Sequence, residues 1–120
     1  MVVNELDALR EKYESCNTIA FADLSTQMIL VTDSSSNRRR EVLDDLCAEA
    51  SLLLGANGKL AIGLKQSNSA LVASKSSVRI FLRAEDEPND VLCCICAPTV
   101  DAGAFLADAR ACIDRISSAA

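Results

Sequence analysis

The fold of this chain is decided by residues 38–54, which read RRREVLDDLCAEASLLL. Within this stretch, apolar residues recur at intervals of three and four, which places them along one side of an α-helix. The members of this apolar stripe are Val42, Leu43, Leu46, Cys47, Ala50, Leu53 and Leu54. A stripe of this kind is typical of a helix that packs against the core of its own domain.

The opposite side of the same helix is also partly apolar, which is unusual for a surface helix. Ala48 and Leu52 lie one turn apart there, and Ser51 lies beside them. Small and apolar residues on a face turned away from the core indicate that something else covers that face. We therefore predict that this helix packs on its own sheet with one side and on a second copy of the chain with the other.

The length and composition exclude several classes of protein. A chain of 120 residues has the length of one domain, so we expect a single domain over residues 1–120. Half of the residues are hydrophobic, which excludes a disordered chain, and the net charge of −5 argues against nucleic-acid binding. No apolar run approaches the ~20 residues of a membrane-spanning helix, and the N-terminus lacks a signal peptide's apolar segment. We expect a cytoplasmic protein with no membrane insertion.

The remaining apolar patterns predict two further helices and five strands. Helices are expected over residues 2–14 and from about residue 101 onward. Strands are expected over residues 18–22, 28–32, 69–74, 78–83 and 91–97. The predicted order is therefore α-β-β-α-β-β-β-α, an α+β fold in which a five-stranded antiparallel sheet carries helices on its faces.

Two of these strands carry more specific expectations. Residues 91–97 are apolar throughout, so we expect this strand in the middle of the sheet with both faces covered. Residues 78–83 alternate, which predicts a half-buried strand with Arg79, Phe81 and Arg83 on a polar outer face. Residues 59–67 have no clear pattern and predict a short turn or a loop.

The three consecutive arginines, Arg38, Arg39 and Arg40, are the most distinctive charged feature. Ser36 or Asn37 is the expected N-cap, and Gly55 or Asn57-Gly58 the expected end of the helix. These bounds place the three cations in the first turn, where the helix dipole disfavours positive charge. Two interpretations remain open for them and for the outward arginines of strand 78–83. They form solubilising pairs with nearby acids (Glu41, Asp44 or Asp45), or they contact an acidic patch on a protein partner.

The six cysteines lie in apolar patterns, and three of them form the sequence Cys93-Cys94-x-Cys96. In a strand, Cys94 and Cys96 share one face and Cys93 points to the other. The chain contains no histidine and no C-x-x-C pair, so a four-ligand zinc site cannot be assembled in the usual way. We expect reduced thiols packed as small hydrophobic residues. A small-ligand or thiol-based redox sensor domain is the alternative.

No catalytic or cofactor motif is present in the sequence. Without histidine, neither a Cys–His nor a Ser–His–Asp arrangement can be built. The glycine-rich phosphate and dinucleotide motifs are missing, and the acidic stretch 85–90 lacks the spacing of a calcium loop. We predict a protein that is not an enzyme and that uses no cofactor or metal.

Three stretches carry a resemblance to a known family. They are AFADLSTQMILVTD (residues 20–33), VLDDLCAEASLLL (42–54) and VRIFLRAEDEPNDVLCCICAPTVDAGAFLADARACIDRI (78–116). With the element order, they make residues 2–117 resemble the roadblock/LC7 family of small dimeric domains, whose fold is profilin-like. The chain departs from the family in its first hairpin, where Asp23 to Gln27 contains no glycine.

The resemblance implies a homodimer that regulates or scaffolds a protein partner, such as a small Ras-like GTPase or a larger motor or signalling assembly. In the family the second helix and the third strand pair with their symmetry mates, which corresponds to residues 41–54 and 69–75 here. The expected dimer interface is Asp44, Ala48, Ser51, Leu52, Ala70, Leu71, Val72 and Ala73. The candidate partner-binding residues are Arg38, Arg39, Arg40, Glu41, Asp45 and Glu49.

Overall fold

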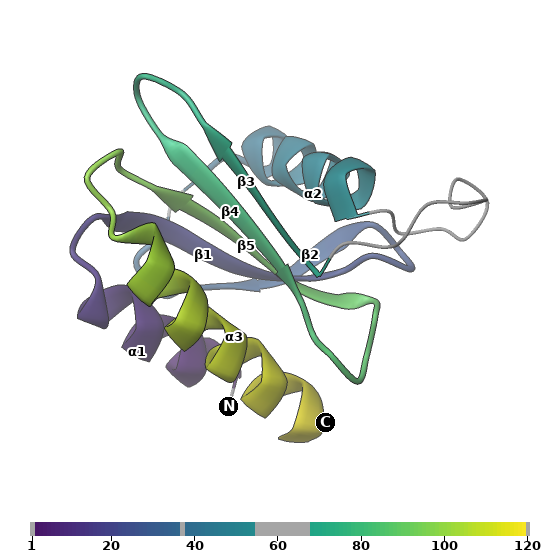
Figure 1. Cartoon of the computed structure of the whole chain (residues 1–120). Coiled ribbons are helices and arrows are strands. Elements are labelled where there is room, and N and C mark those ends of the chain that lie inside the picture. Colours follow the sequence, from purple (N-terminus) through teal and green to yellow (C-terminus); the bar gives the residue numbers. More distant parts are fainter. Residues whose placement is uncertain (1, 37, 55–67, 120) are drawn as a thin grey trace.

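The computed structural model describes residues 2–36, 38–54 and 68–119, which form one antiparallel sheet with helices on both faces (Figure 1). In chain order the elements are α1 (Val2–Lys12), β1 (Cys16–Asp23), β2 (Met28–Thr32), α2 (Arg40–Leu54), β3 (Ser69–Ala73), β4 (Val78–Arg83), β5 (Asp90–Cys96) and α3 (Ala102–Ala119). The predicted element order and the α+β class are confirmed. The helix stop expected at residues 55–58 and the unassigned stretch 59–67 lie outside the described residues.

The strands follow the order β2-β1-β5-β4-β3 across the sheet, and every neighbouring pair is antiparallel. The prediction that the apolar strand lies in the middle is confirmed, because β5 pairs with β1 on one side and β4 on the other. Its residues 91–96 are all buried. In the described sheet, β2 and β3 are the two edge strands.

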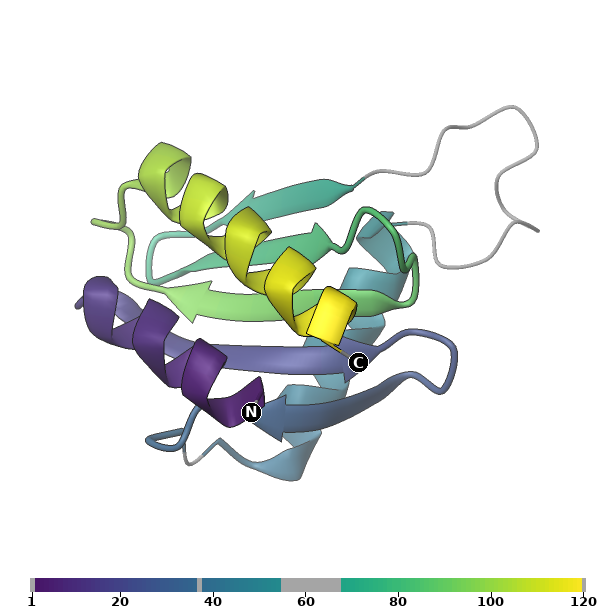
Figure 2. The ribbon, with the colours of Figure 1, turned by 90° about the horizontal axis from the view of Figure 1, so that it is seen from below.

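The helices divide unequally between the two faces of the sheet. Figure 2 shows α1 and α3 side by side on one face and α2 alone behind the other. Each face has its own apolar core, with Phe105 and Cys94 on the side of α1 and α3, and Leu46, Phe81 and Cys93 on the side of α2. The cysteines of β5 therefore alternate between the two cores as predicted.

The prediction of a polar outer face for β4 is wrong. Phe81 is fully buried under α2, and Arg83 is only 2% exposed. The Arg83 Nη2 donates a hydrogen bond to the Leu54 carbonyl at 2.8 Å, at the C-terminal end of α2. Burial lowers the pKa of Arg83. Both faces of β4 are covered. Successive residues of this strand therefore point into the two cores in turn.

The first hairpin achieves its turn without glycine. Gln27 adopts a left-handed backbone conformation, with φ of 55°. The Asp23 carboxylate accepts hydrogen bonds from the Ser25 backbone N–H at 3.0 Å and the Ser25 hydroxyl at 2.7 Å. These bonds lower the pKa of Asp23. The aspartate and the positive φ at Gln27 together supply the turn for which glycine is the usual choice.

Two predicted helix boundaries require correction. The first helix ends at Lys12, two residues earlier than expected, and Tyr13 follows it. The central helix begins at Arg40, and its first turn is closed by a hydrogen bond from the Leu43 N–H to the Arg39 carbonyl at 3.2 Å. Arg38 and Arg39 therefore precede the helix, and only Arg40 stands in its first turn. In the described part of the chain, no helix is long and apolar enough to cross a membrane.

Candidate interaction surface

The outer side of α2 exposes large apolar side chains. Leu46, Cys47, Ala50 and Leu54 are buried against the sheet, which confirms the centre of the predicted stripe. Val42 and Leu53, predicted to be in the stripe, are instead 36% and 38% exposed. Val42, Glu49 and Leu53 are seven and four residues apart, so they lie along one side of α2. The sheet does not fully cover that side.

Leu52 is the most exposed large apolar residue in the described chain, at 75%. Ala48 is exposed beside it, Ser51 is half-buried, and Asp44 is exposed near the start of the helix. The structure therefore places the predicted residues of α2 together on the side turned away from the sheet. Whether a second chain covers them remains a prediction.

The edge strand β3 lies beside α2 (Figure 1). Ala70 and Val72 are half-buried and pack against the core under α2, whereas Leu71 is 45% exposed and Ala73 is exposed. In the described sheet, β3 pairs with β4 alone, so its other edge presents unpaired backbone donors and acceptors. The predicted strand residues thus combine an open edge with an apolar side chain.

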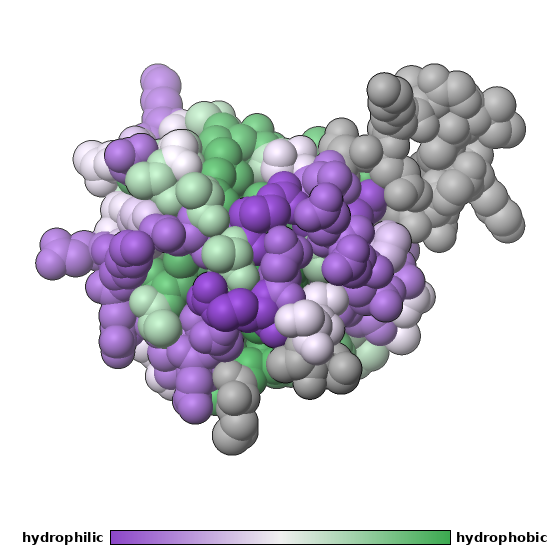
Figure 3. Space-filling view, turned by 60° about the horizontal axis from the view of Figure 1, so that its bottom comes forward, coloured by the Kyte–Doolittle hydropathy of each residue, from purple (hydrophilic) through white to green (hydrophobic). Residues whose placement is uncertain are grey.

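The face of the molecule that carries α1 and α3 differs from the outer side of α2 in its hydropathy. The surface over α1 and α3 is largely hydrophilic, with apolar residues in smaller patches (Figure 3). The large apolar side chains that are exposed in the described chain lie on α2, β2 and β3: Met28, Leu30, Val42, Leu52, Leu53 and Leu71. Contiguous exposed apolar patches are typical of interaction sites in proteins.

Glu49, a predicted partner-binding residue, makes an ion pair within the domain. The Arg79 Nε and Nη2 donate to its two carboxylate oxygens at 2.5 and 3.0 Å, and both side chains are about one-third exposed. The hydrogen bond to Glu49 raises the pKa of Arg79. This fork ties α2 to β4 and borders a 250 Å³ hollow that Val42 and Asp45 also line. Asp45 and Glu41 are exposed.

The three consecutive arginines have three different environments. Arg40 forms an exposed pair with Asp44 at 3.5 Å, one turn along α2, as the solubilising interpretation expects. The Arg38 Nε donates to the Thr18 Oγ1 at 3.2 Å, and Thr18 on β1 is 1% exposed. Arg39 is exposed beside Arg38. The expectation that all three share the first helical turn is therefore wrong.

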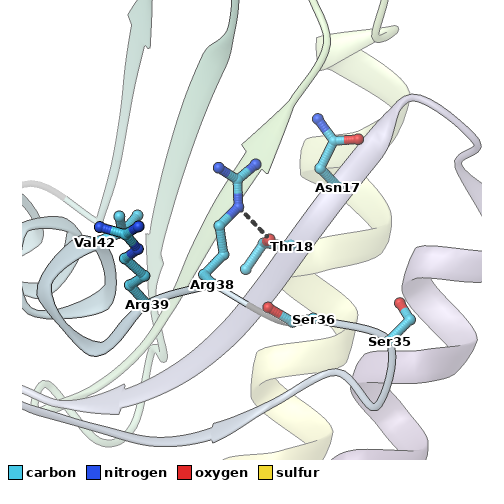
Figure 4. A pocket seen from close by; sticks show the side chains of 7 residues that line it. All are labelled: Asn17, Thr18, Ser35, Ser36, Arg38, Arg39 and Val42. Atoms are coloured by element: carbon cyan, nitrogen blue, oxygen red, sulfur yellow. Dashed lines mark hydrogen bonds between the residues drawn. The ribbon is translucent and has the colours of Figure 1, made fainter.

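Arg38 and Arg39 line a pocket of about 450 Å³ between β1 and the segment that precedes α2 (Figure 4). Asn17 and Thr18 contribute from β1, Ser35 and Ser36 from the loop, and Val42 borders α2. Sequence reasoning missed the residues from β1 and the loop. The signal available was a polar pair, Asn17-Thr18, at the start of an otherwise apolar strand.

The cysteines are all buried and unpaired by disulfides, which confirms the prediction of packed thiols. Burial raises the pKa of Cys93, and raises the pKa of Cys112 to about 11. Thiols with raised pKa values are poor nucleophiles. Cys96 differs, because hydrogen bonding with Cys16 lowers its pKa. The redox-sensor alternative therefore remains a prediction. Within residues 2–36, 38–54 and 68–119, no group of three or more His, Cys, Asp or Glu is placed to hold a metal ion.

The sequence matches no protein-family model, and no curated protein resembles it significantly in sequence. Solved structures nevertheless share its architecture. A roadblock/LC7 domain from Streptomyces avermitilis superposes with a TM-score of 0.75 at 12% identity, covering 95% of this chain and 92% of that one. MglB in a tetrameric arrangement gives 0.76 at 12% identity, with coverages of 98% and 85%. LokiProfilin1, solved with rabbit actin, gives 0.66 at 13% identity, with coverages of 99% and 96%.

The chain therefore has a roadblock/LC7-like fold, as its sequence resemblance indicated, and that fold is related to profilin. At these identities the likeness concerns the architecture. Function depends on the surfaces of this chain, which the fold alone does not define.

Proposed function

We propose that this protein is a non-catalytic, homodimeric regulatory or scaffold module that binds a protein partner. The observation that carries the proposal is the outer side of α2, where Leu52 is 75% exposed, next to the open edge of β3, where Leu71 is 45% exposed on the other face of the sheet. Helix-to-helix contact between two copies would remove Leu52 from water, and pairing of the two β3 edges would cover Leu71. The proposed interface is Asp44, Ala48, Ser51, Leu52, Ala70, Leu71, Val72 and Ala73.

The energetics favour a symmetric contact. Fully burying one leucine side chain stabilises an assembly by roughly 1.5–3 kcal/mol, and a twofold axis makes each contribution count twice. The small residues Ala48 and Ser51 leave room for a second helix to approach closely. Pairing of two β3 edges satisfies the backbone groups that the described sheet leaves open.

Structural neighbours support the proposal by analogy. MglB adopts a tetrameric arrangement, and LokiProfilin1 is in complex with rabbit actin, so folds of this kind serve protein assembly. For this chain, the resemblance to the roadblock/LC7 family favours a small Ras-like GTPase or a larger motor or signalling assembly as the partner. The function is then stoichiometric binding in the cytoplasm, with no bond made or broken.

The proposed contact residues for that partner surround the paired helices. Exposed Glu41 and Asp45 present carboxylates, and Glu49 remains partly exposed beside Arg79. Arg38, Arg39 and Arg40 add positive charge at the N-terminal end of α2. A rim that carries both positive and negative charges would mainly determine which partner binds and in which orientation. It would contribute less to the binding affinity.

Sedimentation velocity tests the dimer. The double substitution Ala48→Glu with Leu52→Glu places two charges per chain in the proposed contact, and we expect the monomer mass instead of the dimer mass. Ala107→Glu is the matched control, because Ala107 is exposed on α3. A wild-type protein that sediments as a monomer, or a double variant that keeps the dimer mass, contradicts the proposal.

The partner is tested separately. A purified small Ras-like GTPase from the same organism, loaded with GTP or GDP, is titrated into the dimer. Saturable binding that Asp45→Arg weakens, while the dimer mass stays unchanged, supports the proposed rim. Equal binding by wild type and variant contradicts the placement of the partner at this rim.

A further inference from the structure

We propose that the pocket lined by Arg38 and Arg39 binds a phosphoryl group carried by a small ligand. The pocket lies beside the N-terminus of α2, and its residues all belong to one chain (Figure 4). The inference goes beyond the proposed function and does not rest on it, because the pocket is complete without self-association. It rests first on the partners that the guanidinium groups of Arg38 and Arg39 have and lack.

The first observation is that these two cations lack carboxylate partners. Arg10, Arg40, Arg79 and Arg115 each form an ion pair with an aspartate or a glutamate. In the described part of the chain, no such pair involves Arg38 or Arg39. Acidic residues outnumber basic ones, 17 to 12, so two adjacent cations without a carboxylate are unexpected in this protein.

The second observation is that Arg38 is held in place. Its Nε donates to the hydroxyl of Thr18, which is 1% exposed on β1. This bond leaves the two terminal nitrogens of the guanidinium to extend past Thr18 (Figure 4). An arginine anchored through Nε loses less conformational entropy when its terminal nitrogens bind an anion.

The third observation is an unsatisfied hydroxyl in the pocket wall. The Ser36 Oγ is buried and has no hydrogen-bond partner among the described residues. A buried polar atom without a partner is costly, and a bound acceptor would relieve that cost. The neighbouring Ser35 hydroxyl already donates to Asp33 at 2.7 Å, and Asp33 is in turn paired with Arg10 at 3.1 Å. The negative charge of Asp33 is thereby compensated.

The donor set fits a phosphoryl group better than a carboxylate. One guanidinium satisfies one carboxylate through a bidentate contact. A phosphoryl group carries nearly two negative charges and three acceptor oxygens, which two guanidinium groups and a hydroxyl can share. The α2 dipole adds a favourable potential at its N-terminus. The volume of about 450 Å³ lies within the range of small-molecule sites.

Titration with pyrophosphate, followed by calorimetry and by the backbone amide signals of Thr18 and Ser36, tests the site. We expect saturable binding that Arg38→Gln and Arg39→Gln each weaken by about tenfold or more, because each removes charge-assisted hydrogen bonds. Lys75→Gln is the matched control, since Lys75 is an exposed cation in the turn between β3 and β4. It changes the net charge equally and should alter the affinity by less than about twofold.

A second variant separates positioning from charge. Thr18→Val keeps both arginines and removes the anchor of Arg38, so pyrophosphate binding should weaken while the unfolding temperature remains close to wild type. O-phosphoserine, compared with pyrophosphate, distinguishes a phosphorylated side chain from a free phosphate compound as the source of the group. The dimer mass of Arg38→Gln, measured in parallel, keeps this test apart from that of self-association.

Three results would overturn the inference. The first is the absence of saturable pyrophosphate binding. The second is equal weakening by Lys75→Gln and Arg38→Gln, which would show unspecific attraction. The third is succinate binding as tightly as pyrophosphate, which would assign the pocket to carboxylates.

Discussion

The two faces of the sheet differ in how completely one chain covers them. On one face, α1 and α3 lie side by side, and on the other α2 lies alone (Figure 2). Five strands at about 4.8 Å spacing place the outer two about 19 Å apart, whereas a helix with its side chains is about 10–12 Å wide. Two helices therefore span such a sheet and one does not. The exposed apolar residues of α2 belong to the side with a single helix, whereas Leu71 of β3 alternates with Ala70 and Val72 and points to the other face at the edge of the sheet.

The contacts that join the helices differ in the same way. On the paired side, the Tyr13 hydroxyl donates to Asp108, and the Lys12 ammonium lies 2.9 Å from the same carboxylate. The Arg115 Nε lies 2.7 Å from the Glu5 Oε2 and joins α3 to α1. On the other side, the Arg79–Glu49 fork joins α2 to the sheet below it. The comparison supports the proposal that the outer side of α2 is an interaction surface.

The largest expected effect tests whether the interiors of the two sides are equivalent. Phe81 under α2 and Phe105 on α3 are both fully buried. We expect Phe81→Ala and Phe105→Ala each to lower the free energy of unfolding by about 3–5 kcal/mol, because each opens a cavity. Urea unfolding measures both. A loss below about 1 kcal/mol for Phe81→Ala alone would show that the core under α2 is loosely packed.

The next effect concerns the outer surfaces. If α2 is covered by a second chain, wild-type unfolding depends on protein concentration, and a hundredfold increase adds roughly 2.7 kcal/mol of apparent stability. Leu52→Glu should abolish this dependence, while Ala107→Glu on the paired side retains it. Thermal unfolding at two concentrations provides the measurement. An unfolding temperature that is independent of concentration in the wild type would remove the functional difference between the faces.

Tyr13 offers a pH test of the paired side. Desolvation and the hydrogen bond to Asp108 raise the pKa of Tyr13 to about 12, from a usual value of 10. Its protonated phenol therefore stabilises the fold fully below pH 10, and this stabilisation is lost as the pH rises toward 12. The chain contains one tyrosine, so its absorbance reports this titration directly. Asp108→Asn should move the midpoint toward 10, and Asp114→Asn should leave it near 12.

The smallest effect compares ion pairs on the two sides. Glu49→Gln breaks a fork that is about two-thirds buried, and we expect it to cost about 1 kcal/mol. Glu5→Gln removes the more exposed pair with Arg115 and should cost a few tenths of a kcal/mol. Urea unfolding at low and high salt measures the loss of unfolding free energy for each variant. A larger loss for Glu5→Gln would reverse this ranking.

Much of the architecture could be predicted from periodicity, because apolar spacing is a local property. The strand at 91–97 was expected mid-sheet, and β5 lies there because an uninterrupted apolar run needs cover on both faces. The same reasoning placed Cys93 and Cys94 in opposite cores. It also placed Leu52 outside the helix's own core contact, although the second chain that would cover it remains a prediction.

The sequence by itself determined the order of the elements, the class of the fold and the burial of the thiols, since each follows from residues near one another in the chain. Only the tertiary structure decided that Arg83 is buried under the end of α2, that Val42 and Leu53 are exposed, and that Thr18 anchors Arg38. These features depend on which distant segments become neighbours. A pattern of hydrophobicity reports which side of an element is apolar, and it does not report what lies opposite that side.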